Sequence, residues 1–322
     1  MTPLFDLYIA CRDDDGGVAH VLLGDDGQLQ KQRIWTLPAT MYLALKNKRL
    51  YTVFLDPLKT EESAVAAFEL DEYGSAGFAS SIPTGGAEAC HLSVVGKRVY
   101  VANYQTGSVA KIVPHHRCFV HRHQGGILAP HPHYIAPSPD GKFLLCTDLG
   151  TDTVLTYDFD LNPLCSVKTP PGSGPRHLVY SPDGKFVYCV NELGNTVTVF
   201  SYEKGRLIPL QTVDALPFEH GESYAAAVRL YNGKLYVSHR GADCITVFRV
   251  DGAQLTFEET IPCGGKWPRD FDVFGAFLVC TNEKSDSVTV LCKREGQWTV
   301  CSTLSLSHPL CVVGTKKRRN DV

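Results

Sequence analysis

Three arginines in the sequence are candidates for binding an anion. They are Arg176 in Gly-Pro-Arg-His, Arg240 directly after a histidine, and Arg269 in Trp-Pro-Arg-Asp. A guanidinium group presents a rigid fork of N–H donors that matches a carboxylate or a phosphate in two parallel hydrogen bonds. Drawn together, such groups would hold a substrate that carries an acidic group. The alternative is structural, because an arginine can also pair with an acidic neighbour such as Glu192 and tie adjacent strands together.

Two histidines, His131 and His133, flank Pro132 and are candidates for proton transfer. Imidazole titrates near neutral pH, so either ring could act as general base, proton donor or substrate ligand. The alternative is a packing or capping role beside the proline. The residue types therefore favour acid–base chemistry on an anionic substrate.

A second group of histidines raises the question of a metal site, which we do not predict. His115, His121 and His123 could share one face of a strand. Strand alternation alone produces that pattern, however, and neither a carboxylate nor a cysteine pair accompanies them. The sequence contains no nucleophile elbow, phosphate-binding loop or dinucleotide fingerprint. We expect neither a metal nor an organic cofactor.

The elements that carry these residues recur along the chain. Successive copies of one strand pattern start 43, 49, 45, 43, 48 and 43 residues apart, at Asp6, Arg49, Arg98, Phe143, Phe186, Lys234 and Phe277. Most copies precede a second run of alternating polarity, rich in Val, Thr, Tyr and Phe, and there is no helix-length pattern of period 3.6. A unit of this size cannot bury both of its faces alone, so the repeats must stack on one another.

The fourth and fifth repeats show how each unit is built. Ser-Pro-Asp-Gly precedes the shared strand at 138–141 and again at 181–184. Proline in second, aspartate in third and glycine in fourth position suit a type I turn between antiparallel strands. Each repeat is thus a meander of three or four strands, and seven repeats predict an all-β, seven-bladed β-propeller. The absence of recurrent Gly-His or Trp-Asp dipeptides argues against the WD40 type.

The two ends of the chain complement each other in this prediction. The first shared strand starts at Asp6, which leaves no room before it for the preceding inner strand. Residues 308–313 resemble the start of the other repeats, so we expect them to close the ring by pairing with the N-terminal blade. The prediction is a single domain over residues 1–322, with a frayed tail at 315–322.

The polar residues fall at equivalent ends of the predicted hairpins. The start of an inner strand and the end of the antiparallel strand after it lie at the same end of a hairpin. We therefore expect one pocket, at one mouth of the channel that inner strands line, to receive the candidate side chains: His131, His133, Asp148, Arg176, His177, Glu192, Arg240 and Arg269.

Composition narrows the classes of partner. The net charge of −3 provides no broad positive field for a phosphate backbone, so we do not expect nucleic acid as a partner. The first residues lack a signal peptide and no apolar run is long enough for a membrane span, which predicts a cytoplasmic protein without a membrane partner. Twelve cysteines are too sparse for a disulfide scaffold, and we expect them to be reduced, small core residues.

Three segments resemble the seven-bladed propeller lactonases, a family that includes propeller-type 6-phosphogluconolactonases and 3-carboxy-cis,cis-muconate lactonizing enzymes. They are GPRHLVYSPDGKFVYCVNELGNTVTVFSY from Gly174, HPHYIAPSPDGKFLLCTDLGTDTVLTYDFD from His131 and WPRDFDVFGAFLVCTNEKSDSVTVL from Trp267. The resemblance spans almost the whole chain and keeps the order of the motifs. It implies a cytosolic, metal-independent site at the central channel.

The resemblance also implies roles for residues. His133, Arg176 and Glu192 correspond to the catalytic group, and a further arginine corresponds to Arg240 or Arg269. Two positions depart from the family pattern: Ala227 stands where an acidic residue is common, and His239 where asparagine precedes the arginine. With His131, His177 and Asp148, the two further arginines are predicted to bind substrate.

The implied reaction is hydrolysis of a small anionic lactone, with 6-phosphogluconolactone as the leading substrate. Arg240 and Arg269 would hold the acidic group, Arg176 would face the developing oxyanion, and His133 would be the base that Glu192 orients. Two alternatives remain. One is a lactonizing cycloisomerase in which the arginines bind the carboxylates of a muconate, and the other is a propeller that binds proteins without catalysis.

Overall fold

The computed structural model describes residues 2–13, 16–55, 62–71, 74, 76–113, 119–122 and 129–317. Within these ranges the strands form seven sheets of four strands each, and the helical structure amounts to one 3₁₀ turn, η1 (Glu283–Ser285). The chain is a seven-bladed β-propeller, as the repeats predict. It divides into two compact units, a middle unit (61–63 and 83–261) and a terminal unit (1–60, 64–82 and 262–322).

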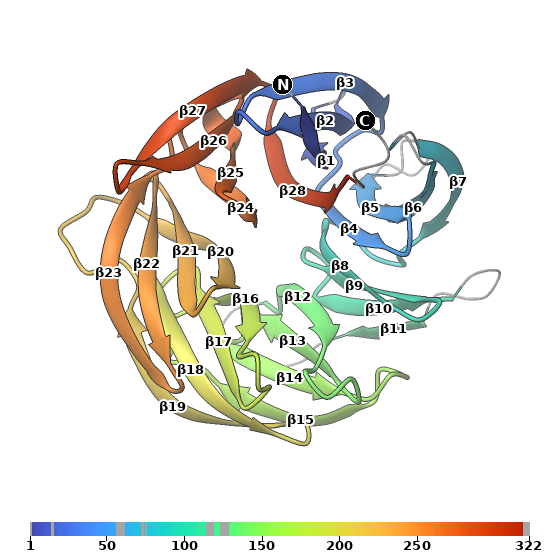
Figure 1. The fold of residues 1–322 in the computed structure, drawn as a ribbon. Coiled ribbons are helices and arrows are strands. Elements are labelled where there is room, and N and C mark those ends of the chain that lie inside the picture. The colour runs from blue at the N-terminus through green and yellow to red at the C-terminus, as the bar shows by residue number, and fades with distance from the viewer. Residues whose placement is uncertain are drawn as a thin grey trace. The chain divides into compact units, whose positions relative to one another are not determined.

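Four sheets belong to the middle unit (Figure 1). The strands, sheet by sheet, are β8 (Ala89–Val95), β9 (Arg98–Asn103), β10 (Ser108–Ile112) and β11 (Phe119–Arg122); β12 (Pro132–Pro137), β13 (Leu144–Asp148), β14 (Thr153–Tyr157) and β15 (Pro163–Lys168); β16 (Pro175–Tyr180), β17 (Phe186–Asn191), β18 (Thr196–Glu203) and β19 (Arg206–Asp214); and β20 (Tyr224–Tyr231), β21 (Lys234–Arg240), β22 (Cys244–Asp251) and β23 (Gln254–Pro262).

Three sheets belong to the terminal unit. The strands are β28 (Pro309–Lys316), β1 (Pro3–Cys11), β2 (Gly17–Gly24) and β3 (Leu29–Thr36); β4 (Tyr42–Lys46), β5 (Arg49–Leu55), β6 (Ser63–Leu70) and β7 (Ala76–Pro83); and β24 (Pro268–Phe274), β25 (Phe277–Asn282), β26 (Ser287–Arg294) and β27 (Gln297–Ser305). That residues 1–322 form a single domain stays a prediction.

The Ser-Pro-Asp-Gly segments form the turns that the sequence predicts. The N–H of Gly141 donates to the Ser138 carbonyl at 2.9 Å, and Gly184 repeats the bond to Ser181 at 2.9 Å. The serine hydroxyl accepts the N–H of the residue that follows the turn, at 3.0 Å from Phe143. Backbone and side chain together therefore fix the β12–β13 and β16–β17 hairpins.

Burial falls from the second strand of a sheet to its fourth. In β17 every residue after Phe186 is buried, whereas β19 has no buried residue along its length. Apolar side chains of β17, β18, β20 and β21 pack into one cluster, so the core lies between neighbouring sheets. This arrangement explains why the repeat cannot be stable as an isolated unit.

The closing strand is confirmed. β28 pairs with β1 in antiparallel register, from Cys11 opposite Pro309 to Phe5 opposite Lys316, and Figure 1 shows the red strand beside the dark-blue one. The predicted tail begins too early, because Thr315 and Lys316 are still in β28. Residues 318–322 lie outside the described residues.

The expectation that all cysteines are reduced is wrong at one place. A disulfide joins Cys292 in β26 to Cys301 in β27. The two strands are adjacent and antiparallel, which brings the two residues within reach of each other. Of the other cysteines that the structure describes, eight are free and buried, in agreement with the core role, and Cys165 is free and exposed.

In the ranges that the structure describes, no helix has the length and apolar character needed to cross a membrane.

Candidate active site

The candidate residues of the middle unit meet at one end of its hairpins. In each sheet the first residue of the first strand pairs with the last residue of the second strand: Pro132 with Asp148, Pro175 with Asn191, and Tyr224 with Arg240. The strand-end geometry expected from the repeats is therefore confirmed for these three sheets.

A β-bulge sets the direction of the two central side chains. The register of β12 shifts between Pro132 and Tyr134, and that of β16 shifts between Pro175 and His177. His133 and Arg176 are thus the extra, bulged residues. A bulge re-aims the side chain that it carries, so these two residues leave the strict alternation of their strands.

Glu192 lies between two guanidinium groups. Its Oε2 is 2.9 Å from Nε of Arg176 and 3.0 Å from Nη2 of Arg240, and its side chain is 16% exposed whereas those of the arginines are 3% and 6% exposed. Two neighbouring cations favour the ionised form of a carboxylate. The carboxylate therefore forms an ion pair with each arginine and fixes the position of both.

Backbone bonds hold Glu192 between two sheets. Its N–H donates to the Gly174 carbonyl at 2.7 Å, and its carbonyl accepts the N–H of Ala225 at 3.2 Å. Gly174 precedes β16 and Ala225 belongs to β20, so the carboxylate stands where two neighbouring blades meet. Glu192 reaches this position because it directly follows the last residue of β17.

The irregular start of β20 supplies acceptors for the same arginines. The register of β20 shifts between Ala225 and Val228. Nη1 of Arg176 donates to the Ala226 carbonyl at 2.8 Å, and Nη2 of Arg240 donates to the Ala225 carbonyl at 3.2 Å. Backbone carbonyl oxygens at the start of β20 thus accept hydrogen bonds from both arginines.

Aromatic rings place the histidines. The ring of Tyr104 stacks on His131 with centroids 4.4 Å apart, and its edge contacts His133 at 5.7 Å. Nδ1 of His131 donates to the Tyr104 carbonyl at 3.0 Å, which in a neutral ring leaves Nε2 as the acceptor. His133 is 4% exposed and lies 5.4 Å, centroid to centroid, from His177.

Behind Arg176 lie two buried histidines that are neutral. Nη1 of Arg176 is 3.4 Å from Nε2 of His177, which must accept because a guanidinium can only donate. Burial, then Arg176 and the neighbouring histidines, hold the pKa of His177 well below its usual range. Burial and Arg176 likewise lower the pKa of His91 to about 3.

Three residues at the site were not assigned a role from the sequence. His91 occupies the same place after a bulge in β8 as His177 does in β16. Burial, then the Glu192 charge, raises the pKa of Tyr104. Tyr224 donates to Glu222 at 2.5 Å and lies under the Arg240 guanidinium, 5.9 Å from its ring centroid. Their positions, equivalent to those of the predicted residues near the strand ends, could have identified all three from the sequence.

Two predicted residues have other contacts. Oδ1 of Asp148 accepts the N–H groups of His131 at 2.9 Å and Thr151 at 3.1 Å, which favours a structural role over substrate binding.

Arg269 belongs to the terminal unit, where it is also a bulged residue and lies 3.7 Å from Glu283. Its convergence with Arg176 stays a prediction.

Among the described residues, no group of three or more His, Cys, Asp or Glu side chains is arranged to hold a metal ion. Of the three histidines discussed above as metal ligands, His115 and His123 lie outside the described residues, and only the backbone of His121 is described.

Fold and site together define a propeller in which two arginines share one carboxylate beside a histidine. The chain belongs to the seven-bladed β-propeller lactonases, because the family model described as "Lactonase, 7-bladed beta-propeller" matches residues 6–313.

Relatives support this membership over most of the chain. An uncharacterized protein from Staphylococcus aureus (strain USA300) is 32% identical over 310 residues, which cover 86% of this chain and 89% of that protein. The periplasmic gluconolactonase PpgL of Pseudomonas aeruginosa superposes with a TM-score of 0.88 at 28% identity, covering 98% of this chain and 100% of that one. A proposed 6-phosphogluconolactonase from Bacteroides fragilis NCTC 9343 gives 0.87 at 26% identity, covering 97% and 98%.

Proposed function

We propose that the protein hydrolyses a sugar lactone that carries an acidic group, with 6-phosphogluconolactone as the substrate. The observation that carries the proposal is the Arg176–Glu192–Arg240 cluster, in a chain of the lactonase family. His133 lies 5.4 Å, centroid to centroid, from His177, whose Nε2 contacts Arg176. The similarity to a gluconolactonase and to a proposed 6-phosphogluconolactonase supports a sugar lactone.

The proposed mechanism assigns one task to each group. Water attacks the lactone carbonyl while His133 takes its proton, and negative charge develops on the carbonyl oxygen, which faces Arg176. Collapse of this intermediate breaks the bond between the carbonyl carbon and the ring oxygen. The ring oxygen then takes the proton from His133, and the product is the open hydroxy acid.

The remaining residues bind and orient. Arg240 anchors the acidic group of the substrate, and His131 contributes a ring nitrogen acceptor at the rim. Glu192 holds Arg176 and Arg240 in place through its two ion pairs, at 2.9 and 3.0 Å. A carboxylate between two guanidinium groups is a poor base, which leaves that role to His133.

The test is the rate of 6-phosphogluconolactone hydrolysis by the pure protein, with and without chelator, corrected for the spontaneous reaction. Arg176→Ala should lose about 2 to 4 kcal/mol of transition-state stabilisation, roughly a 30- to 1,000-fold lower kcat. The matched control is Arg249→Ala, since Arg249 is exposed in β22, and it should leave the rate unchanged.

Two results would overturn the proposal. One is a rate at the spontaneous background, and the other is an Arg176→Ala rate within about threefold of the parent protein. A panel of muconates, followed by ultraviolet absorbance, then tests the lactonizing reaction at the same arginines.

The same proposal places the enzyme in the cytoplasm, in the carbohydrate metabolism of the pentose phosphate pathway. The similar gluconolactonase from Pseudomonas aeruginosa is periplasmic. Fractionation of cells that express the full chain decides between the two compartments.

A further inference from the structure

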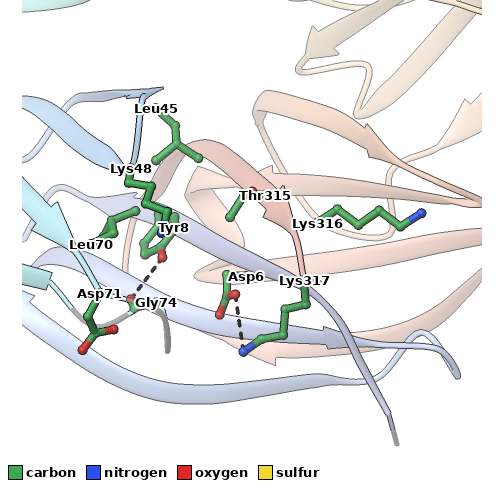
Figure 2. A pocket seen from close by; sticks show the side chains of 10 residues that line it. All are labelled: Asp6, Tyr8, Leu45, Lys48, Leu70, Asp71, Gly74, Thr315, Lys316 and Lys317. Atoms are coloured by element: carbon green, nitrogen blue, oxygen red, sulfur yellow. Dashed lines mark hydrogen bonds and ion pairs between the residues drawn. The ribbon is translucent and has the colours of Figure 1, made fainter. Parts of the chain in front are cut away.

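A pocket of about 250 Å³ lies in the terminal unit (Figure 2). Residues of β1, β28 and β6 and of the turn between β4 and β5 line it. In β28, Thr315 pairs with Asp6, whereas Pro309 at the other end of the strand pairs with Cys11. The pocket therefore lies at the strand ends opposite to Pro309, the residue equivalent to Pro132 and Pro175 of the candidate active site.

A balanced group of charges forms the floor of this pocket. Oδ1 of the buried Asp6 is 2.7 Å from Nε2 of His20. Oδ2 of Asp6 is 3.4 Å from Nζ of Lys317, and a dashed line in Figure 2 marks this ion pair. The Lys317 backbone N–H donates to the Leu4 carbonyl at 2.8 Å, which fixes the base of that side chain. An ammonium group has three donors, so Lys317 retains donors for a ligand.

Two further cations line the pocket. Lys48 stands in the turn between β4 and β5, and Lys316 ends β28. Neither forms an ion pair with another residue among those that the structure describes. Asp6 is already compensated by Lys317, and Asp71 is the other carboxylate of the lining. The balance of charge in the pocket therefore favours an anion.

The uncharged part of the lining suits hydroxyl groups and a short carbon chain. The Tyr8 hydroxyl donates to the Gly74 carbonyl at 3.0 Å and can accept in turn. Gly74 has φ +76°, and a Cβ there would lie 2.7 Å from Oδ1 of Asp6, so glycine leaves space beside the carboxylate. Thr315 adds a hydroxyl, while Leu45 and Leu70 add apolar surface.

We propose that this pocket binds a small hydroxylated anion, such as a sugar acid or a sugar phosphate. The acidic group lies against Lys48 and Lys317, and the hydroxyls face Asp6, Tyr8 and Thr315. The volume suits a ligand of a few carbon atoms rather than a large cofactor. The proposal does not depend on the lactonase activity, since none of its residues belongs to the candidate active site.

The test measures binding to the full chain by calorimetry and by hydrogen exchange, with 6-phosphogluconate, gluconate and inorganic phosphate as the probes. The Arg176→Ala protein is used throughout, so that binding at the candidate active site is weakened. We expect at least one sugar acid to protect the backbone amides of 45–48 and 315–317 from exchange, and to bind more tightly than inorganic phosphate. The comparison of 6-phosphogluconate with gluconate separates a phosphate from a carboxylate as the recognised group.

Substitutions locate the anion. Lys48→Gln should weaken binding roughly tenfold, because it removes one charge-assisted hydrogen bond. Lys317→Arg keeps the charge beside Asp6 and should retain binding, and Lys204→Gln is the matched control, since its side chain is 85% exposed. Thermal unfolding of each variant shows that the fold is kept.

Three outcomes overturn the proposal: no protection of these amides by either sugar acid, an unchanged affinity in Lys48→Gln, or equal affinity for inorganic phosphate and 6-phosphogluconate. A protein that lacks lactonase activity but binds a sugar acid here would refute the proposed function and leave this proposal standing.

Discussion

In the candidate site, charged arginine and glutamate side chains lie close to histidines that are neutral. Glu192 fixes two guanidinium groups at 2.9 and 3.0 Å, whereas the histidines behind Arg176 remain uncharged. The pKa of His177 lies well below its usual range because burial and the Arg176 charge both disfavour a second cation. A neutral His177 can therefore accept a hydrogen bond from Arg176, which makes it a positioning residue.

His177→Leu removes this acceptor and should lower kcat roughly tenfold, because the loss of one hydrogen bond to a charged group costs about 1.5 to 3 kcal/mol. His177→Gln retains an acceptor and should restore part of the rate. Since His177 stays neutral throughout the working range, the pH profile of kcat should keep its shape in both variants. A role in packing alone predicts equal rates in the Leu and Gln variants at matched stability.

The sequence predicted the residues of the Arg176–Glu192–Arg240 cluster but not their surroundings. His133, Arg176, Glu192 and Arg240 come from motifs and strand-end positions, and the structure brings the last three together. Tyr104 escaped assignment, since its ring reaches the histidines from a neighbouring sheet. Contacts between sheets depend on packing, which no local pattern in the sequence records.

At the scale of single elements, the turns and strand starts do much of the positioning. The repeated strands and the Ser-Pro-Asp-Gly turns were predictable because each is fixed by local hydrogen bonds and by alternation. The bulges at His133 and Arg176 were not, since a register shift depends on the partner strand. The bulge nevertheless explains why the side chains of these two residues depart from the strand alternation.

Asp148 at the end of β13 shows how a strand end is held. Asp148→Ala leaves the N–H groups of His131 and Thr151 without their acceptor and should cost about 1 to 3 kcal/mol of unfolding free energy. Asp148→Asn keeps an oxygen acceptor and should cost less. Urea unfolding measures both, with Asp251→Ala at the exposed end of β22 as the control. If Asp148 instead binds substrate, KM rises in the Asn variant while stability is kept.

At the scale of the whole molecule, buried neutral histidines make the fold sensitive to acid. Burial lowers the pKa of His91 and of His239 to about 3, from the ordinary value of 6.5. Between these values the unfolded chain binds protons that the folded chain does not. The free energy of unfolding therefore falls as the pH falls below about 6.5, by about 1.4 kcal/mol per pH unit for each histidine.

Urea unfolding between about pH 8 and pH 5 tests this expectation. His239→Gln removes one titrating group. The slope of its unfolding free energy against pH should therefore be smaller than that of the parent protein, by the amount that corresponds to about one proton. Thr256→Ala is the control, because Thr256 is exposed in β23 and carries no titratable group. Equal slopes in the parent and His239→Gln would show that this histidine is already protonated in the folded protein.

Closure by β28 should be the most sensitive point of the whole fold, because β1 would otherwise lose its partner on one side. Leu7, Ile9 and Val312 have no exposed surface and pack in one cluster across the β1–β28 pair. Val312→Ala should cost about 1 to 3 kcal/mol of unfolding free energy. Val300→Ala, at a site 46% exposed, should cost far less.

Removal of residues 309–322 should go further and abolish cooperative unfolding, since the hydrogen bonds along β1 and the apolar contacts of β28 are lost together. A synthetic peptide of residues 309–317, added in excess, supplies the missing strand and should restore a cooperative transition followed by circular dichroism. A scrambled peptide of the same composition should not. If the truncated chain unfolds cooperatively at the parent's midpoint without peptide, then closure by this strand is not what stabilises the propeller.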